Sequence, residues 1–166
     1  WTKDNKMQEH LLVDGNNALH AIPEIGRELK YDRNQARDSL LRMLEPLATK
    51  GNFLVTVVFD GRDSPLSLRK HREINEFTII FSSSVEGADG AIEKMLMAAK
   101  HPDRIVVVTN DSLIRNCAYA HGASAMRVEE MVKRMDYEIE SFRAKRVWEK
   151  PFKEGDSFEN KIPFPK

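Results

Sequence analysis

Several features that mark particular protein classes are scarce or missing in this sequence of 166 residues. Its one cysteine, Cys117, excludes an internal disulfide framework and a cysteine-based zinc site. Lys plus Arg and Asp plus Glu both total 26, and the resulting formal charge of +0 excludes binding to nucleic acid by bulk charge, although a local basic groove remains compatible with it. No apolar run approaches the ~20 residues that span a bilayer, so we expect no membrane association.

Motifs for common cofactors are also missing. No glycine-rich phosphate-binding motif follows an apolar run, which argues against a nucleotide-binding Rossmann protein. The histidines show no paired ligand spacing. Apolar residues still make up 41% of the chain, which is enough for a real core. We therefore expect a reduced, cytoplasmic domain at residues 8–146, followed at 147–166 by a proline-containing extension that is peripheral or disordered.

Apolar runs alternate with helical patterns along the chain. Near-continuous runs rich in β-branched residues are typical of strands covered on both faces, and they lie at residues 10–13, 53–59, 77–81, 105–109 and 124–128. Between them, Asp32 and Gln35 form a capping box that opens a helix, which Pro46 is expected to kink or end early. The alternation predicts an α/β sandwich with a mainly parallel sheet.

Acidic residues follow the predicted strands at their carboxyl ends. Asp14, Asp60 and Asp111 each come after a strand, and Glu86 and Asp89 precede or begin the helix after a third. Ligands of open α/β sheets bind at this edge. Clustered carboxylates repel one another unless a cation neutralises them, and oxygen ligands without cysteine favour Mg²⁺ or Mn²⁺. The pattern predicts a metal site that activates water against a phosphodiester.

Each of these acids also has a structural explanation. Asp111 suits the N-cap of a helix, Asp60 with its following glycine suits a turn, and Glu86 and Asp89 suit the positive end of a helix dipole. Asp14 is harder to explain by packing alone, because it directly follows a buried run and precedes Gly-Asn-Asn. Their joint occurrence favours the metal site.

Four motifs, in order within residues 10–142, resemble the NYN/PIN-like ribonucleases, and most of all the YacP-like bacterial branch. They are VDGNN (13–17), VVFDG (57–61), EGADG (86–90) and TNDSLIR (109–115). The resemblance implies a PIN-like, mainly parallel five-stranded sheet of order 3-2-1-4-5. It also implies an endoribonuclease site that depends on Mg²⁺ or Mn²⁺.

The resemblance further implies roles for individual residues. Asp14, Asp89 and Asp111 would form the metal-binding core, with Glu86 and Asp60 as outer acids. Asn17 would orient Asp14 or contact the scissile phosphate.

Two positions depart from the family pattern. Asn16 replaces an aromatic residue of the D-G-Y-N motif, and Arg115 replaces an Asp found in other NYN proteins. We expect both side chains to face the substrate, with Arg115 adding positive charge suited to a phosphate.

A basic segment lies between the second and third predicted strands and contains Arg69, Lys70 and Arg72. We expect it to form a loop over the acidic cleft and to neutralise RNA phosphates. A second basic stretch at residues 143–150 includes Trp148, which could stack a base. For each stretch taken alone, ordinary solvated surface is the slightly better explanation, and the first stretch is the better candidate for RNA binding.

The sequence therefore predicts an endoribonuclease that hydrolyses single-stranded RNA, with a ribosome or another ribonucleoprotein as a candidate partner. The alternative is a catalytically weak NYN-like module that binds RNA or protein. A phosphotransfer enzyme of the haloacid dehalogenase type is disfavoured, because it needs an acid where this chain has Asn16.

Overall fold

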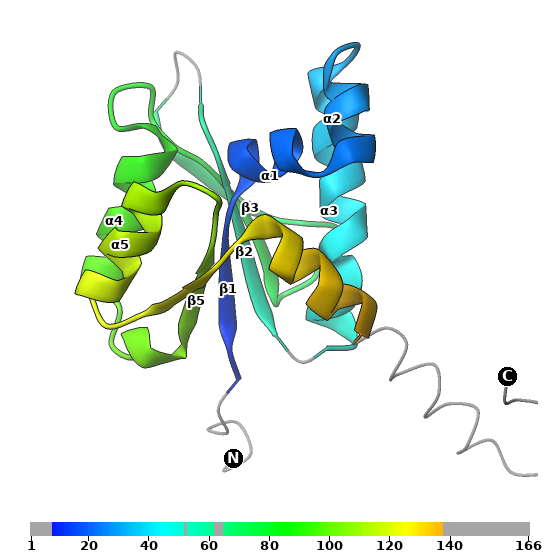
Figure 1. Cartoon of the computed structure of the whole chain (residues 1–166). Helices are drawn as coiled ribbons and strands as arrows, with labels where there is room; N and C mark the ends of the chain where they lie inside the picture. Colours follow the sequence, from blue (N-terminus) through cyan, green and yellow to red (C-terminus); the bar gives the residue numbers. More distant parts are fainter. Residues whose placement is uncertain (1–7, 52, 62–64, 138–166) are drawn as a thin grey trace, which may run out of the picture.

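The computed structural model describes residues 8–51, 53–61 and 65–137. Within these residues the chain forms one six-stranded sheet with helices on both faces (Figure 1). The strand order is β3-β4-β2-β1-β5-β6. A mainly parallel α/β sandwich, as predicted, is confirmed.

Five of the strands are parallel. They are β1 (His10–Asp14), β2 (Leu54–Phe59), β4 (Phe77–Phe81), β5 (Ile105–Val108) and β6 (Ser124–Met126). Taken alone, these strands have the predicted order 3-2-1-4-5, with β1 between β2 and β5. The carboxyl ends of β1, β2 and β5 therefore meet at one edge, which we call the carboxyl edge.

The prediction of five strands was wrong by one. Ser67–Lys70 forms an additional strand, β3, which pairs antiparallel with β4 at the edge of the sheet. All four of its residues are exposed, so the segment lacks the buried apolar run that marks the other strands. Ladder hydrogen bonds to β4, rather than burial, define this strand.

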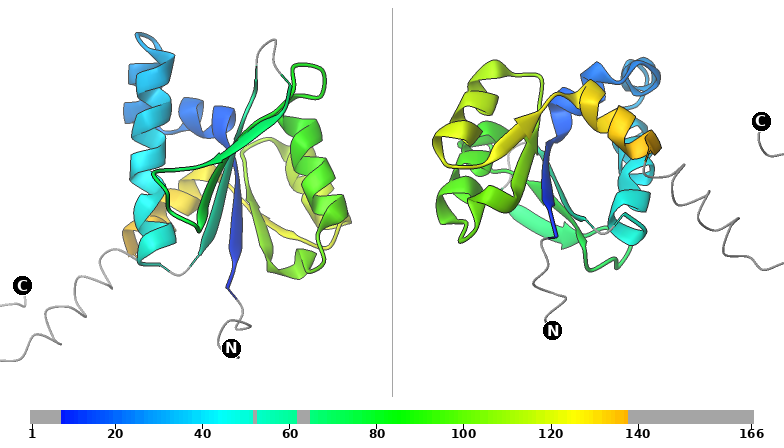
Figure 2. Two further views of the ribbon diagram at one scale, coloured as in Figure 1. Left: turned by 180° about the vertical axis from the view of Figure 1, so that it is seen from behind. Right: turned by 60° about the horizontal axis from the view of Figure 1, so that its bottom comes forward.

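Two helical layers enclose the sheet (Figures 1 and 2). Helices α1 (Gly15–Ala21), α2 (Pro23–Leu29), α3 (Arg33–Thr49) and the helical residues 128–137 cover one face; α4 (Gly87–Ala98) and α5 (Ser112–Ala120) cover the other. Successive strand residues alternate between the two cores. Leu11 and Val13 face the α3 side, and Leu12 faces the α4 side.

Helix α3 begins where the sequence predicts. The Asp32 carboxylate caps it by accepting hydrogen bonds from the backbone N–H groups of Asn34 and Gln35. The expected early end at Pro46 was wrong, because the helix continues to Thr49. Burial of Leu44 and Leu47 on either side of the proline holds the last turn against the sheet.

No helix among the described residues is long and apolar enough to cross a membrane. The second basic stretch and the predicted extension at 147–166 lie outside the described residues.

Candidate functional site

Four of the predicted acids converge at the carboxyl edge because of strand alternation and helix starts. Residues two apart along a strand lie on the same face of a sheet. Asp14 therefore shares the face of Leu12, and Asp60 shares the face of Val58, which is the α4 side of the sheet. Asp89 lies in the first turn of α4, and Asp111 is the N-cap of α5. We call these four residues the acid cluster.

Asp14 lies deepest in the acid cluster, with 6% of its surface exposed. Burial raises its pKa to about 6, even though hydrogen bonds from the Thr109 hydroxyl and from the Asn17 backbone lower it. The negative charges of Asp89 and Asp60 raise it further. Asp14 is thus a carboxylate that the fold keeps in an unfavourable electrostatic environment.

Thr109 connects Asp14 to Asp111. The fully buried Thr109 hydroxyl donates to Oδ2 of Asp14 at 2.8 Å and accepts from the backbone N–H of Asp111 at 3.1 Å. Oδ1 of Asp111 accepts from the backbone N–H of Leu113, so the N-cap role holds. As an N-cap, Asp111 still acts on Asp89: after burial, the negative charge of Asp111 is the next cause that raises the pKa of Asp89.

Asp60 links β2 to two other elements. Its Oδ1 accepts from the backbone N–H of Ala88 at the start of α4, and its Oδ2 accepts from Nδ2 of Asn16, both at 2.7 Å. The Asp60 side chain therefore holds α1 and α4 at the acid cluster. Asn16, expected to face the substrate, donates to Asp60, and its Oδ1 is a buried atom without a hydrogen-bond partner.

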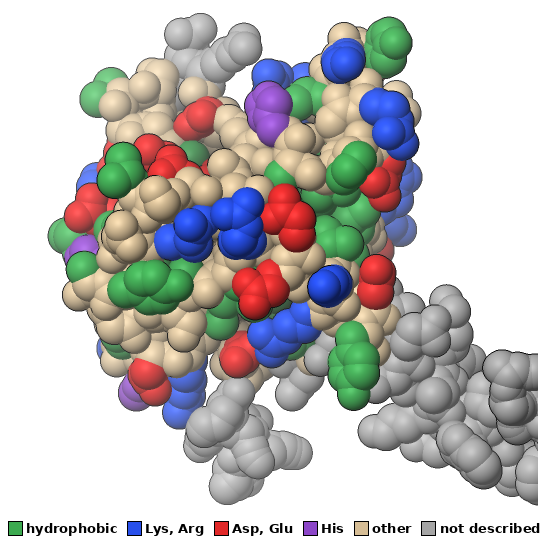
Figure 3. Space-filling view, in the orientation of Figure 1, with side chains coloured by type: hydrophobic (Ala, Val, Ile, Leu, Met, Phe, Trp, Pro, Cys, Tyr) green, Lys and Arg blue, Asp and Glu red, His purple; other side chains and the backbone are tan. Residues whose placement is uncertain are grey.

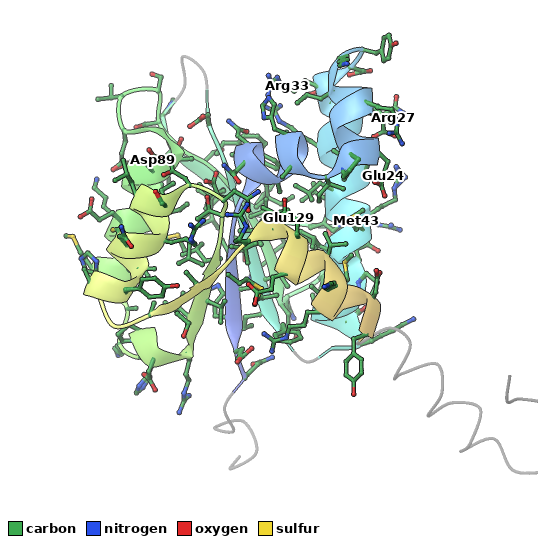
Figure 4. All side chains as sticks on the ribbon, viewed as in Figure 1. Glu24, Arg27, Arg33, Met43, Asp89 and Glu129 are labelled. Carbon is green, nitrogen blue, oxygen red and sulfur yellow. The ribbon has the colours of Figure 1, made fainter. Side chains whose placement is uncertain are left out.

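Asp89, like Asp60, is an exposed member of the cluster. Partial burial, followed by the charges of Asp111 and Asp60, raises its pKa. Figure 4 shows Asp89 at the upper edge of the molecule, at the start of α4. Figure 3 shows acidic side chains over the same region, and Lys and Arg side chains over α2 and in a patch at the centre of this face. The exposed side of the cluster is open to solvent and thus to a substrate.

Glu86 is directed along α4 and pairs with a lysine. Its Oε2 lies 2.7 Å from Nζ of Lys94. Gly90 makes room for this path, because a Cβ there would lie 2.6 Å from Cγ of Glu86. The structure thus places the Glu86 carboxylate in an ion pair with Lys94.

Asn17 and Arg115 brace the loop after β5. Oδ1 of Asn17 accepts from the backbone N–H of Asn110 at 2.8 Å, and Nη1 of Arg115 donates to the Thr109 carbonyl at 3.2 Å. The expected orienting role of Asn17 toward Asp14 is played by its backbone N–H rather than by its side chain. Both residues hold the segment that carries Thr109 and Asp111.

The expected loop of basic residues over the cleft was wrong. Because β3 is antiparallel to β4, the chain leaves the carboxyl edge at Ser67 and moves toward the opposite edge, where Lys70 pairs with Thr78. Nζ of Lys70 donates to the Asn75 carbonyl and the Thr78 hydroxyl, and Arg72 pairs with Glu45 at 3.2 Å. The guanidinium of Arg69 lies over the ring of Phe81. These residues do not surround Asp14.

The family model for the YacP-like NYN domain matches residues 11–163. The chain belongs to this family. It is 33% identical over 129 residues to the uncharacterized protein YacP of Bacillus subtilis, covering 76% of this chain and 74% of YacP. NYN domains are nuclease-like, which gives this YacP-like NYN chain a nuclease-type, RNA-related role.

Two crystal structures of Rae1 (YacP) from Bacillus subtilis have the same fold. One, of a point mutant of Rae1, superposes with a TM-score of 0.68 at 26% identity, covering 86% of this chain and 83% of Rae1. The other structure gives a TM-score of 0.63 at 30% identity, covering 87% and 84%.

The donor chemistry of this YacP-like site suits a hard divalent cation. Four carboxylates lie at one edge, and burial together with the neighbouring negative charges raises the pKa values of Asp14 and Asp89, so a cation would stabilise their charged forms. Among the described residues, no three Asp, Glu, His or Cys side chains are close enough to ligate one ion together. Mg²⁺ commonly uses one or two carboxylates and several waters, so the donor set fits it without a closed cage.

Sequence reasoning missed Thr109, although the quoted motif TNDSLIR begins with it. Thr109 directly follows the buried strand β5 and is itself fully buried, so its hydroxyl needs a hydrogen-bond partner. Asp14 supplies that partner. That requirement is the signal that could have identified it.

Proposed function

We propose that this protein is an endoribonuclease that hydrolyses phosphodiester bonds of single-stranded RNA at the acid cluster, with Mg²⁺ or Mn²⁺ as cofactor. The observation that carries the proposal is the placement of four carboxylates, those of Asp14, Asp60, Asp89 and Asp111, at one sheet edge. Keeping like charges together costs stability, and functional sites are where such arrangements concentrate.

In this proposal the acids have different tasks. Asp14 and Asp89, a buried and an exposed carboxylate, would ligate the ion together with waters, and Asp111 would hold one of those waters. Asp60 acts mainly as a positioning residue, because both of its oxygens accept hydrogen bonds from Asn16 and Ala88. Thr109 fixes the orientation of the Asp14 carboxylate.

The ion, when bound, would supply a more acidic water and charge stabilisation of the leaving oxygen. The chain's own part is to keep the carboxylates oriented, as Thr109 does for Asp14. Arg115, held at the Thr109 carbonyl, adds a positive charge at the edge of the cluster. A phosphodiester approaching the exposed Asp89 meets this charge near the acids.

The test is cleavage of a mixed-sequence single-stranded RNA by the full chain with Mg²⁺, Mn²⁺ or EDTA, beside thermal melts of the same samples. We expect metal-dependent cutting and metal-dependent stabilisation. Asp14→Asn should lose both, with cleavage falling by roughly 10²-fold or more. Asp103→Asn is the matched control, because Asp103 is an exposed acid in the turn before β5, away from the carboxyl edge.

The opposite results separate the candidate functions. Loss of cutting in Asp103→Asn as well as Asp14→Asn would contradict the site assignment. RNA binding without cutting or metal response would favour a binding module. That second candidate has one observation in its favour, because no three potential ligands among the described residues are close enough to share one ion.

A further inference from the structure

A seam lined by arginines runs down the α3 face of the molecule, between α3 and the edge strand β3. Two hollows follow one another along it. The upper one, of about 520 Å³, lies between the first turns of α3 and the end of β2 at Asp60 and Gly61. The lower one, of about 430 Å³, is lined by the next turn of α3 and by β3. Figure 2 shows this edge of the sheet from behind, with α3 beside it.

Cationic side chains enter the seam from both walls. Arg33 and Arg37, one turn apart on α3, line the upper hollow, and Arg42 and Arg69 line the lower one. Residues paired across an antiparallel ladder share a face, so Arg69 projects on the same side as its partner Ile79, which belongs to the α3 core. Arg69 is thus the member of the basic segment that faces the seam.

Phe81 holds two of these arginines in place. The guanidinium of Arg37 lies 5.4 Å and that of Arg69 lies 5.7 Å from the centroid of the Phe81 ring. Arg37 also lies 5.3 Å from the ring centroid of Phe59. Stacking uses the flat face of a guanidinium and fixes the plane of its N–H edge. Nη1 of Arg37 also donates to Oδ1 of Asn34 at 3.4 Å. Two pre-oriented cations therefore meet near the middle of the seam.

The acids of the seam do not cancel this pattern. Asp32 caps α3, with its carboxylate committed to the N–H groups of Asn34 and Gln35. Asp60 belongs to the acid cluster. Among the described residues that line the lower hollow, Asp38 is the one acid beside Arg42, Arg69 and Lys70, while Arg72 is paired with Glu45.

Asp60 joins the seam to the acid cluster. It lines the upper hollow, and its carboxylate contacts Asn16 and the start of α4. The helix rise of 1.5 Å per residue places Arg42 about 14 Å along α3 from Arg33, a length suited to a few nucleotides. A single-stranded RNA that leaves the acid cluster at Asp60 would therefore enter the arginine-lined seam.

We infer that this seam binds the single-stranded RNA on one side of the scissile bond, with successive phosphates at Arg37, Arg69 and Arg42. The inference rests on the proposed nuclease function, because it assigns the path of that enzyme's substrate. It replaces the expected basic loop over the cleft with a channel on the α3 face.

The test measures the affinity of the full chain for a fluorescent mixed-sequence single-stranded RNA in EDTA, at several salt concentrations. We expect Arg37→Gln/Arg42→Gln/Arg69→Gln to weaken binding at least about tenfold and to reduce the slope of log K against log salt by about 2, as three lost phosphate contacts require. The control Lys30→Gln/Lys100→Gln/Lys133→Gln removes the same charge from exposed positions outside the seam, and its slope should stay near that of the unaltered chain.

Because Arg37 packs on two rings, its replacement also removes packing, and the triple variant needs a companion that leaves the rings covered. Arg42→Glu, at an exposed helix position, provides this second variant, and it should weaken binding about fivefold with an unchanged melt. Equal losses in the seam and control variants would overturn the inference. If the unaltered chain cuts RNA and the seam variants bind and cut normally, the seam fails while the nuclease function stands. If it never cuts, but the seam variants alone lose RNA affinity, the proposed function fails and the seam stands.

Discussion

The hydroxyl of Thr109 donates to the buried carboxylate of Asp14 across 2.8 Å, although 95 residues separate the two in sequence. The same hydroxyl accepts from the backbone of Asp111. One side chain therefore fixes two acids that arrive from neighbouring strands, β1 and β5. A local requirement for satisfied polar groups thereby becomes a means of building the site.

Asp14→Asn is expected to stabilise the metal-free protein above about pH 6. The folded-state pKa of Asp14 is about 6, above the ordinary 3.8, so folding favours the protonated form. Wild-type stability should fall as pH rises from the unfolded-state pKa to the folded-state pKa, and should then level off. The Asn variant avoids this loss, which is on the order of 3 kcal/mol at neutral pH. Urea unfolding in EDTA at several pH values measures the difference.

At pH 3 and below the two proteins should unfold at nearly the same urea concentration, because Asp14 of the wild type is then largely protonated in both the folded and the unfolded state. Mg²⁺ should reverse the order at neutral pH by stabilising wild type alone. An Asn variant that is less stable than wild type in EDTA at every pH would contradict the electrostatic account.

Thr109→Val should impair cleavage more than Thr109→Ser does. Valine has a similar shape but removes both hydrogen bonds and leaves the Asp111 N–H without its partner, a loss of about 1–3 kcal/mol. Because the Thr109 hydroxyl lowers the pKa of Asp14, its removal should move the acid limb of the cleavage pH profile to higher pH. Serine should keep the profile of wild type. An unshifted profile in Thr109→Val would limit Thr109 to a packing role.

The parallel core was predictable because each of its strands is a buried apolar run with a turn or a helix start behind it. Val57, Ile79 and Val107 are buried although they lie on different faces of the sheet. An unbroken apolar run is therefore enough to predict a strand that is covered on both faces. β3 carries no such signal. Its exposed Arg69 and Lys70 join the sheet through backbone hydrogen bonds, which side-chain patterns do not reveal.

The candidate site was predictable to the level of which residues meet, but not to the level of what each contacts. Strand-end positions brought Asp14, Asp60 and Asp111 together. The pairing of Glu86 with Lys94 depends on the room that Gly90 leaves beside the helix. The path of the arginine-lined seam depends on the direction of β3. Both are tertiary features, and spacing along the chain does not encode them directly.

Glu86→Gln should reduce cleavage far less than Asp89→Asn. The carboxylate of Glu86 is paired with Lys94, so its replacement breaks a partly exposed ion pair and leaves the acid cluster unchanged. Asp89 shares the electrostatic field of Asp60 and Asp111. We expect a loss below about tenfold for Glu86→Gln and above roughly 10²-fold for Asp89→Asn, measured as single-turnover cleavage with saturating Mg²⁺. Equal losses would return Glu86 to the catalytic set that the family resemblance implies.

Gly61→Ala should destabilise the fold at the carboxyl edge of the sheet. A Cβ on Gly61 would overlap the carbonyl oxygen of Ser82, which follows β4 and whose backbone N–H donates to Phe59. Because backbone atoms must move to relieve this overlap, we expect a loss of at least about 2 kcal/mol in urea unfolding. Gly26→Ala is the matched control. Gly26 lies inside α2, where alanine is favoured over glycine. A Cβ there would lie 3.4 Å from the His20 carbonyl oxygen, an ordinary van der Waals contact. The control should be neutral or stabilising, and an unchanged midpoint in Gly61→Ala would show that β2 and β4 can separate at this edge without cost.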